Sequence, residues 1–140
     1  MGNTINKKKG LSFTLTKPAK KAGLVSGEDQ PEGHHVRVYG FDQYIIVAGI
    51  DDITDENLSE IIVTAIEYTK TAYSATDNKI SKVGHGWAVQ LAPAKNAGFE
   101  ADDELEAKVA PGLVLLKREY NHPLDDKLVS LRKSQLNNKN

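Results

Sequence analysis

The heptapeptide Pro18-Ala19-Lys20-Lys21-Ala22-Gly23-Leu24 recurs 75 residues later as Pro93-Ala94-Lys95-Asn96-Ala97-Gly98-Phe99. Five of the seven positions are identical. Each heptapeptide follows a segment of alternating apolar and polar residues, 11–16 or 87–91, which is typical of a half-buried strand. An acidic loop and a strand-turn-strand pattern follow each one. Because the order of elements agrees along with the residues, we interpret the chain as two tandem repeats rather than a chance match.

Each repeat is predicted to contain two strand pairs and a short helical turn. The opening strands are indicated by the similarity of Ile5-Asn6-Lys7 to Ile80-Ser81-Lys82. The heptapeptide predicts a helical turn that begins at its proline. The closing strand pairs are rich in β-branched and apolar residues and flank Asp42-Gln43 or Ala110-Pro111-Gly112, and they span residues 36–41 with 44–48 and 104–109 with 113–117.

An amphipathic helix is predicted between the repeats, over residues 55–73. Thr54 or Asp55 can cap its N-terminus, and its apolar face is formed by Leu58, Ile61, Ile62, Ala65, Ile66 and Thr69. After Tyr120 the chain is polar, although Leu124, Leu128 and Leu131 have the spacing of a short helix after Pro123. The chain therefore divides into a first repeat (1–50), a connecting helix (51–77), a second repeat (78–120) and a polar tail (121–140).

Composition narrows the class of protein. The chain has 140 residues, 39% hydrophobic and 26% charged, which fits a globular domain. Because it has no cysteine, disulfides, thiol nucleophiles and cysteine-based metal sites are excluded. The longest apolar runs are strand-length, so we expect no membrane segment and no membrane partner, and we expect the protein to be cytoplasmic.

The net charge of −1 is a sum over unlike segments. Residues 1–25 hold six lysines and no acid, residues 26–75 hold ten acids and two bases, and residues 76–140 are nearly balanced. A uniformly basic protein that coats nucleic acid is therefore excluded, whereas a basic face of limited size is not.

The second repeat resembles the SpoVT/AbrB-type swapped-hairpin domain, especially its MazE-like antitoxin branch. Residues 79–93, Lys-Ile-Ser-Lys-Val-Gly-His-Gly-Trp-Ala-Val-Gln-Leu-Ala-Pro, are similar to the opening of that domain. Residues 97–109 resemble its acidic loop and alternating strand, and residues 112–117 resemble its closing strand. The resemblance covers residues 78–118, and residues 3–50 look like a degenerate copy with an expanded loop at 26–33.

The resemblance implies a mainly β fold, in which tandem AbrB-like swapped-hairpin repeats form a small β-barrel beside the connecting α-helix. Each copy is incomplete alone, because about 45 residues cannot bury enough surface. The two copies can close the barrel within one chain, as a monomeric pseudo-dimer, or between two chains of a homodimer.

The resemblance also implies a basic DNA-binding face at the first strand-turn-strand and near the short helix. The residues that fall at such positions are Lys7, Lys8, Lys9, Lys17, Lys20, Lys79, Lys82, His85, Gln90 and Lys95. Gln90 stands where the family often has arginine, and it can hydrogen-bond an adenine edge but removes a charge. The lysines of residues 7–9 suit either phosphate contacts or a solvated run, and His85 suits either a phosphate contact or a turn.

Other chemistry-bearing residues favour structural roles. Trp87 alternates with core residues, and Arg37 is expected on an exposed strand face. His34-His35 has no partner at metal-ligand spacing, and neighbouring acids such as Asp51-Asp52 do not converge on one substrate. We therefore expect no enzyme activity, no metal and no cofactor.

The sequence thus favours an AbrB-type transcriptional regulator that grips the phosphates of double-stranded DNA. The alternative is an antitoxin-like module that neutralises a toxin or docks another protein, or a second copy of itself, through its helix or tail. A third possibility is that the lysine-rich face binds an acidic protein and the DNA function is lost.

Overall fold

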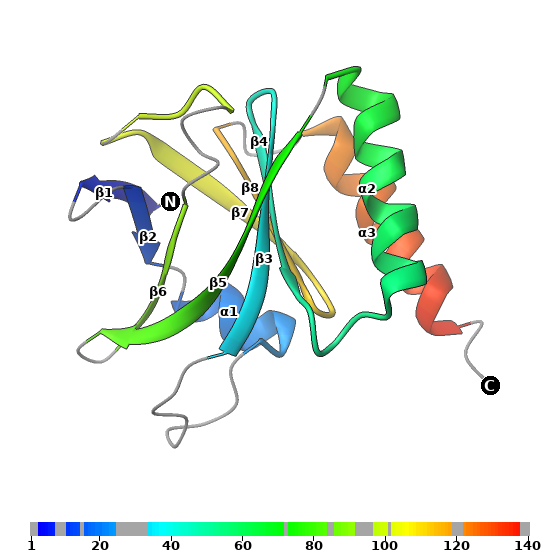
Figure 1. The fold of residues 1–140 in the computed structure, drawn as a ribbon, viewed down its shortest axis with the longest axis horizontal. Coiled ribbons are helices and arrows are strands. Elements are labelled where there is room, and N and C mark those ends of the chain that lie inside the picture. The colour runs from blue at the N-terminus through cyan, green and yellow to red at the C-terminus, as the bar shows by residue number, and fades with distance from the viewer. Residues whose placement is uncertain are drawn as a thin grey trace.

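The chain folds into an antiparallel sheet, curled into a barrel, with three helices packed against it (Figure 1). The computed structural model describes residues 3–7, 11–14, 16–24, 34–71, 73–83, 86–91, 97–100, 102–118 and 122–137. Within these ranges the strands are β1 (Asn3–Lys7), β2 (Leu11–Thr14), β3 (His34–Phe41), β4 (Tyr44–Gly49), β5 (Ser74–Val83), β6 (Gly86–Gln90), β7 (Glu104–Ala110) and β8 (Leu113–Lys117). The helices are α1 (Thr16–Ala22), α2 (Asp55–Thr69) and α3 (Pro123–Asn137).

The helix content exceeds the prediction. The sequence predicted a mainly β protein with one connecting helix, whereas the fold is mixed α/β with two helices of 15 residues each. The predicted polar tail contains α3, whose Leu124 and Leu128 are buried. The connecting helix begins as predicted, because Thr54 Oγ1 accepts from the Asn57 N–H, but it ends at Thr69, where Lys70 adopts a left-handed conformation with φ of 56°.

The two repeats interleave within this single chain. The strands pair in the circular order β1-β2-β6-β5-β3-β4-β8-β7, and β1 of the first repeat closes the circle on β7 of the second. In the same way, β5 of the second repeat pairs with β3 of the first. The opening hairpin of each repeat therefore joins the closing hairpin of the other.

The registers of these two junctions are equivalent. Asn3 pairs with Leu105, and Asn78, 75 residues after Asn3, pairs with Val36, 69 residues before Leu105. The shift of 75 also relates the two heptapeptides, and the shift of 69 relates the two closing hairpins. The first repeat therefore has six more residues between heptapeptide and hairpin, where an expanded loop was predicted. Residues 25–33 themselves lie outside the described part of the chain.

The heptapeptides end in the same conformation. Gly23 and Gly98 have φ of 78° and 91°, values that glycine adopts without steric penalty. In the first repeat, the N–H groups of Gly23 and Leu24 donate to the carbonyls of Lys20 and Ala19 and so cap α1. The residues around each glycine are buried, namely Ala22 and Leu24 in one repeat and Ala97 and Phe99 in the other.

Each heptapeptide is held by the hairpin turn of the other repeat. The Gly112 N–H donates to the Ala22 carbonyl at 2.7 Å, and the Gln43 N–H donates to the Ala97 carbonyl at 2.8 Å. Gln43 and Gly112 occupy equivalent turn positions, and both have positive φ. These reciprocal hydrogen bonds fasten the two repeats to each other.

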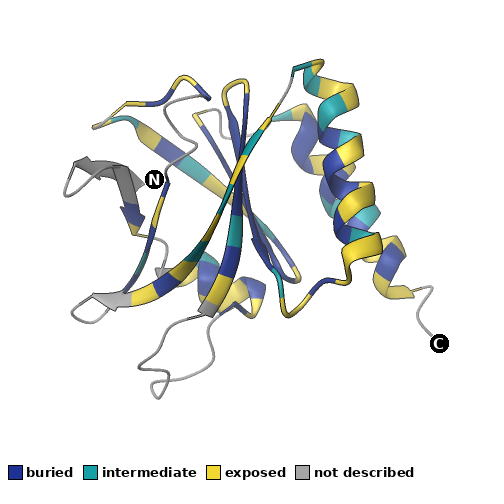
Figure 2. Cartoon of the chain, viewed as in Figure 1, coloured by how far each residue is buried: buried dark blue, intermediate teal, exposed yellow. Residues whose placement is uncertain are grey.

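Strands β4 and β8 separate two apolar layers, because their residues are buried on both faces (Figure 2). On β4, Ile45 and Val47 lie in the cluster inside the barrel with Phe13, Trp87 and Phe99. The alternate residues of both strands pack with the helices, in a second cluster that contains Tyr44, Ile46, Ala48, Leu58, Ile61, Leu113, Leu115, Leu124 and Leu128. A buried aliphatic side chain contributes about 1.5–3 kcal/mol, so both layers stabilise the fold substantially.

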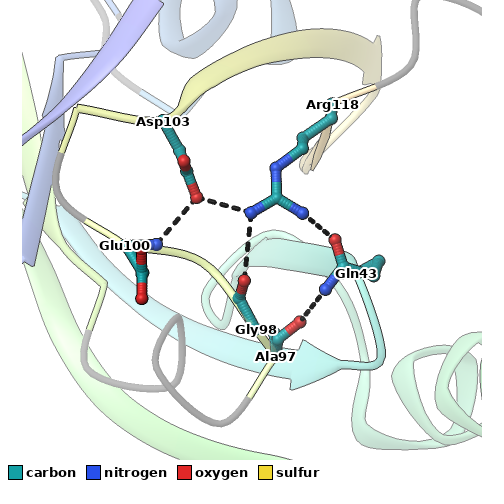
Figure 3. A network of polar contacts seen from close by, with 6 residues as sticks. All are labelled: Gln43, Ala97, Gly98, Glu100, Asp103 and Arg118. Atoms are coloured by element: carbon teal, nitrogen blue, oxygen red, sulfur yellow. Dashed lines mark hydrogen bonds and ion pairs between the residues drawn. The ribbon is translucent and has the colours of Figure 1, made fainter.

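Arg118 adds a polar network at one end of the second heptapeptide (Figure 3). Its guanidinium lies 4.8 Å from the centroid of the Phe99 ring and donates to the Gly98 carbonyl, to Asp103 and to the Gln43 side chain. Asp103 also accepts from the Glu100 N–H, and this bond, followed by the Arg118 contact, lowers the Asp103 pKa. The equivalent position in the first repeat is Gly49, so the network belongs to one repeat alone.

Candidate nucleic-acid interface

The charges of the described residues are segregated between two sides of the molecule. Strands β1, β2, β6 and β5 are adjacent in the sheet, and we call them, together with α1, the basic ribbon. In Figure 1, β1, β2 and β6 lie across the barrel from α2 and α3. The basic ribbon contains one carboxylate, Asp77, and six lysines, Lys7, Lys17, Lys20, Lys21, Lys79 and Lys82. Residues 51–69, which include α2, contain six acids and no base.

The single carboxylate of the basic ribbon is neutralised by an arginine. Arg37 on β3 is paired in register with Asp77 on β5, and its Nε lies 2.5 Å from Asp77 Oδ1. The hydrogen bond lowers the Asp77 pKa and raises the Arg37 pKa. Arg37 is thus part of a strand-face ion pair, consistent with the structural role expected for it, and the lysines of the basic ribbon keep their full positive charge.

Helix α1 presents three lysines to solvent. Ala19 and Ala22 are buried, whereas Lys17, Lys20 and Lys21 are exposed. The segregation follows from sequence, because residues 19 and 22 share a helix face and the lysines lie on the others. Lys21 was not among the predicted contacts, although it stands beside Lys20 in the heptapeptide.

The two strand-turn-strand units lie at opposite ends of the basic ribbon. Ser12 pairs with Gln90 and Thr14 pairs with Ala88, so β2 and β6 are antiparallel and the turns that precede them point apart. Lys7 borders one turn and Lys82 borders the other, at equivalent register positions. With a rise of about 3.3 Å per residue, the turns are about 20 Å apart. Because α1 starts directly after β2, Lys17 lies at the Lys82 end.

Lys79 and Gln90 are exposed on the neighbouring strands β5 and β6. Asn78 links these strands, since its Nδ2 donates to the Gln90 carbonyl at 3.0 Å and its Oδ1 accepts from the Lys79 N–H at 2.8 Å. The Gln90 side chain therefore remains free for a base edge or a phosphate while its backbone is fixed. Asn78 was missed at the sequence level because only the register of β5 against β6 shows what it joins.

The remaining predicted contacts are placed only in part. Lys8, Lys9, His85 and Lys95 lie outside the described residues. For Lys7 and Lys82 the structure gives the backbone position and not the side chain. Trp87 is 3% exposed and belongs to the core inside the barrel, as expected, so it offers no stacking platform for bases.

Other kinds of site find no support in the described ranges. Among these residues no group of three histidines, aspartates or glutamates is arranged to hold a metal ion. No helix in the same ranges is both long enough and apolar enough to span a bilayer. Comparison with known proteins gives no relative: no family model, no curated protein and no solved structure matches the chain.

Proposed function

We propose that this protein is an AbrB-type DNA-binding transcriptional regulator whose basic ribbon grips the phosphates of a duplex. The observation that carries the proposal is the charge segregation: six lysines against one arginine-paired carboxylate on the ribbon, and six acids without a base in residues 51–69 on the other side. Phosphate contacts dominate the affinity of proteins for DNA, so this asymmetry orients the molecule on a duplex.

The topology supports the resemblance on which the proposal draws. A swapped-hairpin domain requires the opening hairpin of one copy to pair with the closing hairpin of the other, and the β1–β7 and β5–β3 pairings have this arrangement. The turns about 20 Å apart fall within one helical turn of B-DNA, about 34 Å, so one duplex can contact both ends of the ribbon. Lysines suit phosphates rather than bidentate base recognition, and Gln90 is the described candidate for reading a base.

Fluorescence anisotropy with a labelled duplex from the upstream region of its own gene tests the proposal. We expect binding that weakens steeply with salt, and a variant with Lys17→Glu, Lys20→Glu and Lys21→Glu should lose about tenfold or more in affinity at low salt. The salt slope should fall by about 0.9 for each lost phosphate contact. The matched control is Lys127→Glu with Lys133→Glu, two exposed lysines of α3, which should leave binding unchanged. Binding that is absent at low salt, or insensitive to the first variant, contradicts the proposal.

The alternative function, docking of a toxin or another protein, is favoured by one observation. Large apolar side chains stand exposed on α2 and α3, with Val63 49%, Tyr68 38% and Leu136 37% exposed. A small toxin encoded next to this gene should then bind the full chain, and Val63→Asp should weaken that binding without affecting DNA binding. A partner that binds through the lysines instead would be lost with the α1 variant.

A further inference from the structure

Helices α2 and α3 occupy equivalent places after the two closing hairpins, yet they are anchored by different chemistry. Helix α2 buries Leu58, Ile61, Ile62 and Ala65. The residues 70 positions later on α3 are Leu128, Leu131, Arg132 and Gln135. Two apolar anchors of α2 are thus replaced on α3 by a buried arginine and a buried glutamine, which are 3% and 8% exposed.

The buried Arg132 binds backbone carbonyls rather than a carboxylate. Its Nε donates to the Pro111 carbonyl at 2.7 Å, and its Nη2 donates to the Asp52 carbonyl at 3.3 Å. Burial lowers its pKa, which shows that the protein solvates this cation less well than water does. Gln135 receives Nη1 of Arg132 on its Oε1 and donates to the Asn57 carbonyl at 2.9 Å.

A buried ion pair holds the first turn of α3. Lys117 Nζ on β8 lies 2.8 Å from Asp125 Oδ2, and the two side chains are 1% and 3% exposed. The contact lacks hydrogen-bond geometry for the ammonium, and burial lowers the Lys117 pKa despite the Asp125 charge. Asp125 also accepts from the Tyr44 hydroxyl at 2.5 Å and from the His122 N–H.

These contacts have a common consequence for the opening of α3. Water can rehydrate Lys117, Asp125 and Arg132 when α3 leaves the sheet, so the loss of their contacts is largely offset. Water offers no such compensation for Ile61 or Ile62, because an apolar side chain loses its whole burial energy on exposure.

We propose that α3 is a releasable cover, which opens from the outer side of β8 as a unit while the barrel and α2 stay folded. Opening exposes Lys117 together with the apolar cluster that α3 shares with Leu113 and Leu115. The chain thereby gains a second, apolar docking surface on the side away from the basic ribbon. This inference does not depend on DNA binding.

Hydrogen exchange of the full-length chain, followed by mass spectrometry or NMR, tests the cover. The amides of residues 127–135 should exchange through a local opening at least about tenfold faster than those of residues 60–68, and with a smaller dependence on denaturant. Equal rates and equal denaturant dependence in the two helices would show that α3 opens only with global unfolding, and would overturn the proposal.

Variants of the ion pair provide the second arm. Lys117→Met leaves the Asp125 charge buried and unpaired, so exchange in α3 should accelerate about tenfold or more while the ratio to α2 rises. Lys117→Met with Asp125→Asn removes both charges but keeps an acceptor for Tyr44 and His122, and it should slow α3 exchange to or below the wild-type rate. Lys127→Ala, at an exposed position on the same helix, is the control and should change neither helix. A proportional change in both helices for Lys117→Met contradicts a separate opening.

Discussion

Gly23 and Gly98 occupy equivalent positions, so they allow the same substitution to be compared in two surroundings. Both have positive φ, which an L side chain adopts with strain. A Cβ at Gly23 would meet nothing within 4 Å, whereas a Cβ at Gly98 would collide with the Gln43 side chain. That side chain donates to the Ala97 carbonyl and accepts from Arg118, so it has little freedom to move away.

Gly98→Ala should therefore destabilise the protein more than Gly23→Ala. The left-handed conformation costs about 1–2 kcal/mol in both variants, and only Gly98→Ala also displaces Gln43 from the network around Arg118. Denaturant unfolding of the two variants and the wild type measures the difference. Equal losses would mean that the Gln43 contacts contribute nothing to stability.

Asp103 gives a prediction for acid. Its pKa is lowered in the fold by the Glu100 N–H and Arg118, so its contribution to stability is present above about pH 3.9, the value in an unfolded chain. That contribution is lost as the pH falls through the folded pKa. Asp103→Asn should be less stable than wild type at pH 7, and the difference should shrink below about pH 4. Thermal unfolding at several pH values measures it, and a constant difference would argue against ionisation as its cause.

Thr54 caps α2 through its hydroxyl, and this cap is the local signal that the sequence supplied. Thr54→Ala should lower the free energy of unfolding by about 1 kcal/mol, because one N–H at the helix start loses its acceptor. Thr64→Ala is a suitable control, since the Thr64 hydroxyl bonds back to the Glu60 carbonyl within the helix and caps nothing. If the two variants lose equal stability, the cap is not the cause.

Elements with local signals could be predicted, and elements set by distant contacts could not. The hairpin turns at Asp42-Gln43 and Ala110-Pro111-Gly112 are encoded by neighbouring residues, and both were placed correctly. The full length of α3 was missed because Arg132 and Gln135 interrupt its apolar face while being buried against carbonyls 21 and 78 residues away. Lys117 continues the parity of Leu113 and Leu115, yet its burial depends on Asp125 in another element.

The candidate interface was predictable to the same extent. Lysines in the heptapeptide and before the turns are visible in sequence, and Lys17, Lys20 and Lys79 are indeed exposed. Their distribution between two ends of the basic ribbon was not visible, because it follows from the antiparallel register of β2 against β6. The neutralising pair of Arg37 and Asp77 is likewise set by the β3–β5 register.

At the scale of the whole molecule, interleaving makes neither repeat complete alone. Strand β1 needs β7, and β5 needs β3, so each half leaves strand edges unpaired. We expect fragments 1–72 and 73–140 to be unfolded separately and to form a folded 1:1 complex when mixed. Circular dichroism and NMR spectra of the fragments and the mixture measure this. A folded spectrum for either fragment alone would contradict the interleaved arrangement.

The closure of β1 on β7 also sets a schedule for the chain as it is made. The partner of Asn3 is Leu105, so at about 5–20 residues per second the first strand waits about 5–20 s for its neighbour to be synthesised. Throughout that interval the newly made segment holds an unpaired strand edge, the usual template for aggregation. Residues 1–25 carry six lysines and no acid, so nascent copies on neighbouring ribosomes repel one another until the second repeat arrives.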